Sequence, residues 1–185
     1  MASAILWVLI AIVAILVIWF IATYNRLVTL RNRIENAWSQ IDVQLKRRFD
    51  LIPNLVETVK GYAKHEKETF KMVTEARTLM MKSDSIKDKA KADNMLTAGL
   101  KSIFAVAEAY PKLMASDNFK MLQEELAGTE SKIAYSRQFY NDNVLSLNQA
   151  IQQFPTNIIS GMFGFKEREY FEVAKAEKEP VKVKF

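Results

Sequence analysis

The side chains that could take part in catalysis or metal binding are few and isolated. His65 is the only histidine, and its neighbours are Lys64, Glu66, Lys67 and Glu68. A zinc site needs three or four ligands, and a catalytic histidine needs a nucleophile and an orienting partner. We therefore expect His65 to be an exposed surface side chain rather than a metal ligand or a general base.

Acidic residues offer a second route to chemistry. Glu108 and the pair Glu124-Glu125 could meet across helices as a two-metal site, but such sites use Glu-x-x-His motifs from two helices, and the sequence contains none. The absence of cysteine removes disulfides and thiolate sites. No glycine-rich phosphate loop, Gly-x-Ser-x-Gly motif or dinucleotide fingerprint occurs. We therefore expect no enzyme, no catalytic residue, no metal, no cofactor and no small-molecule substrate.

Uncharged amides form a regular polar pattern. Such rows can join the polar faces of neighbouring subunits without the cost of desolvating charge, or they can simply form a solvated face. Both interpretations stay open. The candidate subunit contacts are Asn32, Asn36, Gln40 and Gln44 at four-residue steps, matched later in the chain by Gln138, Asn141, Asn148 and Gln152.

The elements that position these residues begin with a membrane span. Ala4–Ala22 is apolar, with no charge before Arg26, and roughly 20 such residues suffice to cross the hydrocarbon layer as a helix. A cleaved signal peptide is the alternative, but the basic n-region is missing and the apolar run exceeds the usual length of roughly 7–15 residues. The predicted anchor residues are Leu6, Trp7, Leu9, Ile12, Ile15, Leu16, Ile18, Trp19 and Phe20.

The distribution of charge predicts the orientation of the chain in the membrane and argues against a nucleic-acid partner. Arg26, Arg31 and Arg33 follow the span, and only the α-amino group precedes it, so the positive-inside rule places the bulk of the chain in the cytoplasm. A periplasmic domain on an N-terminal anchor is the alternative. The net charge of +5 is modest and its signs are mixed along most of the chain, so we expect no nucleic-acid partner.

An apolar stripe continues from the span into the next segment. Its residues recur at steps of three and four, which keeps them on one face of a helix. Neither glycine nor proline intervenes between Tyr24 and Pro53, so we expect the span and the first bundle helix to form one rod. Pro53 lacks an amide hydrogen, so the helix is expected to end or bend there and the chain to turn back near Asp50. The predicted core and turn residues are Ile34, Trp38, Ile41, Leu45, Phe49, Pro53, Leu122, Ile133 and Tyr140.

The basic cluster Lys46-Arg47-Arg48 admits three interpretations: it complements a helix dipole, contacts anionic lipid or binds an acidic partner. The dipole is favoured, because a straight rod holds these residues roughly 35–40 Å from the membrane.

The rest of the chain also has helical periodicity. Five glycines and four prolines are few, which favours long helices. We predict helices over about 53–82, 92–110 and 118–154, a loop over 83–91, and a close helix approach at Gly61. The predicted fold class is all-α, with an N-terminal transmembrane helix continuous with an elongated antiparallel four-helix bundle. The predicted parts are 1–24, the anchor; 25–154, the bundle; and 155–185, an apolar segment and a charged tail.

The segment 155–165 is short, apolar and punctuated by glycine, and we expect one or two irregular helical turns. It either covers the bundle's own core or contacts the membrane interface or a partner. The residues concerned are Ile158, Ile159, Met162, Phe163 and Phe165.

A resemblance adds to this picture. Residues 36–63, together with Ala105-Val-Ala-Glu-Ala-Tyr-Pro111 and Tyr140-Asn-Asp142, resemble the bacterial LemA family. The resemblance covers nearly everything after Thr23. It implies a membrane-anchored antiparallel helical bundle, and it implies little about activity.

The expected function combines the anchor with this resemblance. We expect a non-enzymatic single-pass protein of the bacterial inner (cytoplasmic) membrane whose bundle self-associates as a homo-oligomer to organise or remodel that membrane. The remodelling role is implied by the resemblance, because LemA-like proteins include relatives implicated in it. The alternative is a membrane-tethered adaptor that presents its helical surface to another membrane protein, such as a protease or signalling component.

Overall fold

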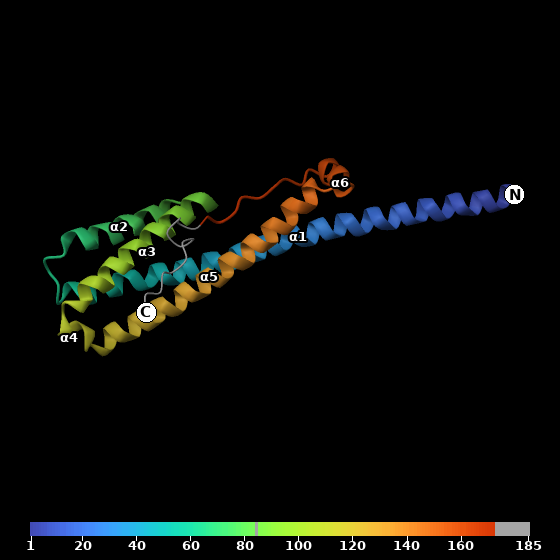
Figure 1. Ribbon diagram of the computed structural model, residues 1–185. Coiled ribbons are helices and arrows are strands. Elements are labelled where there is room, and N and C mark those ends of the chain that lie inside the picture. Colours follow the sequence, from blue (N-terminus) through green and yellow to red (C-terminus); the bar gives the residue numbers. More distant parts are fainter. Residues whose placement is uncertain (84, 173–185) are drawn as a thin grey trace, which may run out of the picture. The chain divides into compact units, whose positions relative to one another are not determined.

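The computed structural model describes residues 1–83 and 85–172, and every regular element among them is a helix (Figure 1). No strand occurs in these residues, so the predicted all-α class is confirmed. The predicted charged tail is described only as far as residue 172, and the rest of it lies outside the described residues. The helices are α1 (Ala2–Lys60), α2 (Lys67–Lys82), α3 (Ile86–Glu108), α4 (Pro111–Met114), α5 (Asp117–Gln152) and α6 (Thr156–Met162).

Helix α1 runs without a break from the apolar N-terminal stretch to Lys60. The predicted continuity of the span with the next helix is confirmed, whereas the predicted turn near Asp50 is wrong, because Pro53 lies inside the helix. A proline in a helix interior costs about 3 kcal/mol or more. Each large apolar side chain buried beside it contributes roughly 1.5–3 kcal/mol, so packing outweighs the defect. The buried residues around the proline are Ile52, Leu55, Val56 and Val59.

The chain turns back over residues 61–66 instead. Gly61 lies in this turn, where its N–H donates to the Glu57 carbonyl at 3.2 Å, and a Cβ on it would meet the Thr58 carbonyl oxygen at 3.3 Å. The predicted helix approach at Gly61 is therefore wrong. The close approach lies between α3 and α2, where a Cβ on Gly99 would stand 2.7 Å from Val73 Cγ2.

The later helix ends follow local capping chemistry. Helix α3 begins earlier than predicted, because the Ser85 hydroxyl accepts a hydrogen bond from the Asp88 N–H at 3.0 Å and caps it. Most of the loop predicted over 83–91 is therefore helical. Pro111 occupies the first position of α4, where its missing N–H costs no helical hydrogen bond.

Contacts between residues group the chain into two compact units. The first joins Met1–Trp38 with Phe139–Arg168, and the second joins Ser39–Gln138 with the segment that follows Arg168. The division into 1–24, 25–154 and 155–185 stays a prediction.

The second unit has one apolar core, to which α1, α2, α3, α4 and α5 all contribute. Phe49 is half-buried at its edge, with Arg77 Cζ 4.6 Å from its ring centre. The antiparallel four-helix arrangement stays a prediction. Among the predicted core residues in this unit, the buried ones are Ile41, Leu45, Leu122 and Ile133.

In the first unit, α1 packs against the C-terminal part of α5. The Trp38 and Tyr140 rings lie 5.9 Å apart, and Ile34 is buried beside them. After α6 the chain returns along α5. There the Asn148 side chain donates to the Arg168 carbonyl at 3.0 Å and accepts from the Arg168 N–H at 2.9 Å.

Candidate functional site

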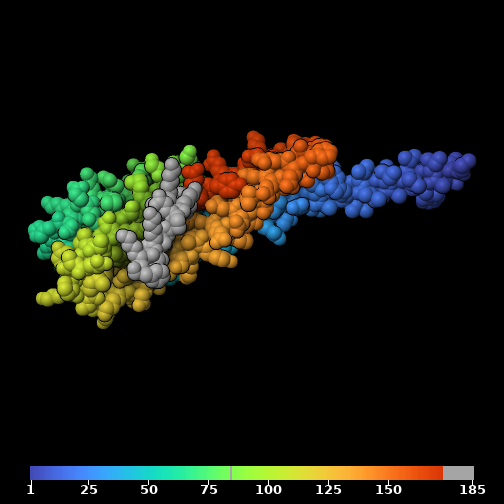
Figure 2. All heavy atoms as spheres, viewed as in Figure 1, coloured from blue at the N-terminus to red at the C-terminus, as the bar shows by residue number. Residues whose placement is uncertain are grey.

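The first unit carries a bare apolar helix. The most apolar stretch of α1 has no buried residue, and α1 is the one helix in the described part of the chain that is long and apolar enough to cross a bilayer. Figure 2 shows this blue stretch extending past α6 without neighbours. Exposed apolar surface on this scale is stable in a hydrocarbon layer and not in water. The predicted anchor residues all lie here, with exposed fractions from 37% at Trp19 to 71% at Trp7 and with Phe20 half-buried.

Helix α6 packs beside the end of that stretch, within the same unit. The Phe163 ring lies 5.9 Å from the Phe20 ring and 4.7 Å from the Tyr24 ring. Phe165 stands 6.1 Å from Tyr24 and lies under the Arg31 guanidinium, whose Cζ is 5.6 Å from its ring centre. The structure therefore brings the predicted apolar segment and the end of the predicted span together.

The amide row on α1 faces outward along most of its length. Asn32, Asn36 and Gln40 are exposed, and Gln44 is half-buried. The Gln44 Oε1 atom is buried and has no hydrogen-bond partner among the described residues. Such an acceptor is costly unless a partner or water reaches it.

The amide row on α5 behaves differently. Gln138 is exposed and Asn141 is half-buried, but Asn148 is 7% exposed and holds Arg168, and Gln152 Nε2 donates to Glu167 Oε1 at 2.8 Å. Asn148 therefore fixes a segment of its own chain, and the role of this row in subunit contacts stays a prediction. Sequence spacing identified the row without showing which amides the fold itself uses.

An open groove of 440 Å³ lies on the second unit between α1 and α5. Two of its side chains are apolar and well exposed, Val43 at 60% and Tyr135 at 74%. The groove carries one charge, from Lys132. The rest of its lining is uncharged amide and hydroxyl, from Ser39, Gln40, Gln44, Ser131 and Ser136.

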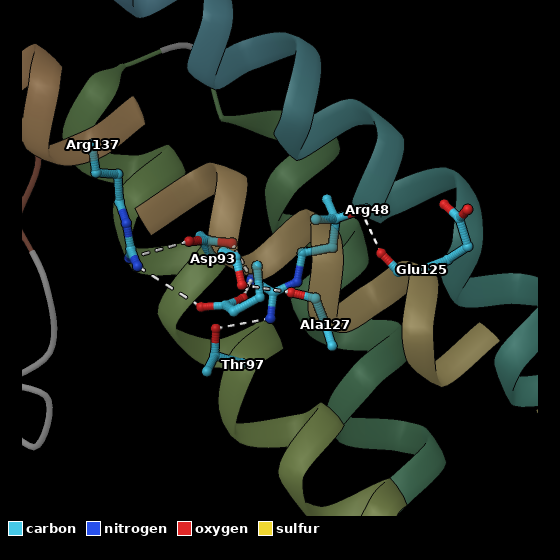
Figure 3. Close-up of polar contacts among 9 residues, drawn as sticks. Arg48, Asp93, Thr97, Glu125, Ala127 and Arg137 are labelled. Carbon is cyan, nitrogen blue, oxygen red and sulfur yellow. Dashed lines mark hydrogen bonds and ion pairs between the residues drawn. The ribbon is translucent and has the colours of Figure 1, made fainter. Parts of the chain in front are cut away.

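The second unit also contains a buried cluster of charges, which we call the ion cluster: Arg48, Asp93, Glu130 and Arg137. Figure 3 shows Asp93 between the two arginines. Arg48 Nη1 lies 2.7 Å from Asp93 Oδ1 and 2.8 Å from Glu130 Oε2, and Nη2 donates to the Thr97 hydroxyl at 3.0 Å. Arg137 approaches the same two carboxylates at 3.6 and 3.8 Å. The cluster joins α1, α3 and α5.

Burial sets the electrostatics of this cluster. The Asp93 side chain is 0% exposed, and loss of solvation raises the pKa of its carboxyl above the ordinary value of 3.8, with Arg48 and Arg137 opposing that rise. Arg137 is covered on its other side by Phe171, whose ring centre is 5.8 Å from the guanidinium carbon. The ion cluster thus links α1, α3 and α5 through buried ion pairs.

The basic run 46–48 does not cap a helix, because α1 continues to Lys60. Arg47 pairs with Glu125 at 2.6 Å at the surface, while Arg48 turns inward. His65 is exposed in the turn after α1. No group of three or more His, Cys, Asp and Glu side chains in residues 1–83 and 85–172 is placed to hold a metal ion.

The positions of the two arginines in the sequence indicate the ion cluster, although the cluster was not among the predictions. Arg48 stands three residues after Leu45 and four before Ile52, which is inside the apolar stripe of α1. Arg137 stands likewise between Ile133 and Tyr140 on α5. A charge within an apolar stripe indicates a buried ion pair, because burial without a partner is prohibitively costly.

Comparisons with known proteins show which family and which relatives this chain resembles. A model of the LemA family matches residues 37–185. The chain is 28% identical over 195 residues to magnetosome protein MamQ 1 of Paramagnetospirillum magneticum, an alignment that covers 89% of this chain and 72% of that protein. It is 26% identical over 203 residues to magnetosome protein MamQ of Magnetospirillum gryphiswaldense, covering 94% and 75%. It is 26% identical over 164 residues to protein LemA of Metamycoplasma hominis, covering 86% and 73%. The bare apolar helix and these similarities together support a membrane-associated protein with one span.

Proposed function

This chain belongs to the LemA family, and from that premise we propose that it is a non-enzymatic single-pass protein whose helical part self-associates to organise or remodel the bacterial inner membrane. The surface proposed for self-association is the groove between α1 and α5 on the second unit, and its occupant is a second copy of the chain.

The observation that carries the proposal is the chemistry of this groove. Exposed Val43 and Tyr135 supply apolar and aromatic area, which is the kind of surface that anchors protein interfaces. The uncharged amides around them can both donate and accept hydrogen bonds. Two identical faces related by a two-fold axis can therefore pair their donors with each other's acceptors. Little charge has to be desolvated, because Lys132 is the one ionised side chain in the groove lining.

The proposed mechanism needs no chemical step. Each copy carries one span, so copies joined through the groove hold their spans at fixed separations and impose a spacing on the lipid between them. Relatives of the chain that are named as magnetosome proteins support the proposal of a membrane role. The cytoplasmic side is proposed for the helical part, with the periplasmic side as the alternative, and labelling of a cysteine introduced at Ser83 distinguishes the two.

The decisive experiment compares Val43→Lys with Met121→Lys in the full-length protein in detergent. Both side chains are 60% exposed on helices of the second unit, but Val43 lines the groove and Met121 does not. In the proposed dimer, a lysine at position 43 lies near Lys132 and near the same lysine of the second copy across the two-fold axis. Like charges placed opposite each other cost several kcal/mol. Even about 2 kcal/mol weakens association roughly 30-fold.

Light scattering across a range of protein concentrations gives the mass of each variant. We expect oligomers for wild type and Met121→Lys, and a shift toward monomer for Val43→Lys. A wild-type protein that stays monomeric at every concentration refutes self-association. If crosslinking of native membranes then yields a different protein in fixed stoichiometry, the adaptor function replaces it.

A further inference from the structure

One stretch near the membrane end of the first unit carries no charge. Between Asp142 and Lys166 the sequence contains no Asp, Glu, Lys, Arg or His, and α6 lies inside this stretch. Several of its large apolar side chains are exposed although α6 packs on the protein. They are Phe154 at 79%, Ile158 at 54%, Met162 at 67% and Phe163 at 49%.

Ring contacts place this apolar surface at a defined level along α1. Phe163 contacts Phe20 and Tyr24, with ring centres 5.9 and 4.7 Å apart. The first charge after the apolar stretch of α1 is Arg26, two residues beyond Tyr24. If α1 crosses the bilayer, the hydrocarbon layer must therefore end near Tyr24, because charged side chains avoid its interior. Helix α6 then lies at the membrane–water boundary.

Backbone hydrogen bonds end α6, and burial shows which of its sides faces out. The Phe165 N–H donates to the Ser160 carbonyl at 2.9 Å and the Gly164 N–H to the Gly161 carbonyl at 3.4 Å, which is a Schellman end. Gly164 has φ +68°, the left-handed conformation that this motif requires. Ile159 and Ser160 are buried, so they form the side that packs on the protein. Ile158 and Met162, which are 54% and 67% exposed, lie on the side that faces away from the protein.

We propose that α6 and its flanking phenylalanines lie in the membrane–water interface, as a second lipid contact beside the span. An apolar helix face at this level gains burial in the headgroup region while its polar side stays hydrated. Charge complementarity supports lipid as the occupant, because Arg31 lies over Phe165 at one end of the uncharged stretch and Lys166 follows it directly, and both cations attract anionic headgroups. This inference rests on the span proposed for α1 but not on self-association.

The test uses the absence of cysteine in the chain, which allows single labels without background. Met162→Cys carries an environment-sensitive fluorophore in the full chain, reconstituted at one copy per nanodisc of phosphatidylcholine and phosphatidylglycerol. Ile158→Cys is a second label site on the same face, and Ile15→Cys reports the span. Quenchers are aqueous iodide and lipids that carry a nitroxide at the headgroup or deep in the acyl chain.

Leu145→Cys is the matched control within the first unit. Leu145 is apolar and 45% exposed, similar to Phe163, but it lies on α5 five residues after Tyr140, which contacts Trp38. At about 1.5 Å per residue this places it roughly 14 Å beyond the level of Tyr24. A label there is expected to remain in water.

We expect headgroup nitroxide to cause a larger loss of fluorescence at positions 162 and 158 than at 145, and iodide to cause a smaller one. Equal iodide quenching at 162 and 145 overturns the inference. Shielding of position 162 from both iodide and lipid nitroxide also overturns it, because a protein surface then covers α6. If position 15 escapes the deep nitroxide, the span itself fails, and this failure is distinct from a monomeric result in the self-association assay.

Discussion

Replacing Arg48 with methionine would remove the central cation of the ion cluster while keeping an unbranched side chain of similar length. Asp93 would keep Arg137 at 3.6 Å but lose its hydrogen bond of 2.7 Å to Arg48. The Asp93 side chain is 0% exposed, so the lost partner is a group buried with it away from solvent. Removing one member of a buried ion pair typically costs about 3–5 kcal/mol.

Protonation sets an upper limit to the part of this cost that comes from Asp93. In the variant, Asp93 can avoid being buried as a charge by taking up a proton in the folded state. The cost of this is the free energy of protonating, at the pH of the experiment, a carboxyl whose ordinary pKa is 3.8. Each pH unit above that value adds about 1.4 kcal/mol, which limits the part of the loss due to Asp93 to about 4 kcal/mol near pH 7 and about 1.6 kcal/mol near pH 5.

The sign follows from proton binding. Burial already raises the pKa of Asp93 in the folded protein, and loss of Arg48 raises it further. The folded variant then holds a proton that the unfolded chain releases above its ordinary pKa of 3.8, so the variant loses stability as pH rises from that value. At pH values below it Asp93 is protonated in both states, and its part of the penalty vanishes.

The assay is denaturant unfolding of the full chain in detergent, followed by far-UV circular dichroism near pH 7 and pH 5. Arg47→Met is the matched control, because Arg47 is the neighbouring residue and also forms an ion pair. That pair lies at the surface, where the Arg47 side chain is 49% exposed and the Glu125 side chain 45%. An exposed pair of this kind contributes about 0–1 kcal/mol. Equal losses for the two variants, or an Arg48→Met loss that does not change with pH, would refute the reasoning.

Two further predictions concern packing and the returning segment. Gly99→Ala is expected to destabilise the protein by about 1 kcal/mol, because overpacking against Val73 costs about 1–3 kcal/mol and exceeds the gain in helix propensity. Gly128→Ala, where a Cβ meets nothing within 4 Å, is expected to stabilise it by about 1 kcal/mol, and thermal unfolding that shows the same sign for both contradicts this packing. Asn148→Ala removes two hydrogen bonds to Arg168, about 1 kcal/mol each, and should accelerate tryptic cleavage after Arg168 roughly 30-fold. An unchanged cleavage rate would show that Asn148 does not hold the segment.

The features that the sequence predicted well are those that depend on composition over many residues. The span follows from a long stretch without charge before Arg26, and the all-α class follows from apolar residues at steps of three and four with few glycines. The helix predicted over about 118–154 matches α5, Asp117–Gln152, to within a few residues. These signals are local, so tertiary contacts are not needed to read them.

The features that the sequence did not predict depend on contacts between distant residues. Pro53 breaks an isolated helix, yet α1 continues through it because buried side chains on both sides hold the backbone in place. Ser85 and Asp88 formed a readable capping signal inside a stretch interpreted as a loop from its charges. Asn148 looked like any other amide in its row, because its partner Arg168 is 20 residues away.

The ion cluster also restricts how α1, α3 and α5 are aligned along their axes. Apolar stripes tolerate sliding, because one leucine or isoleucine can replace another at the same contact. A shift of α1, α3 or α5 by one turn, about 5.4 Å, would instead separate Arg48 and Arg137 from Asp93 and strand opposite charges in apolar surroundings. Three helices that apolar contacts alone would hold in several staggered positions are thereby restricted to one.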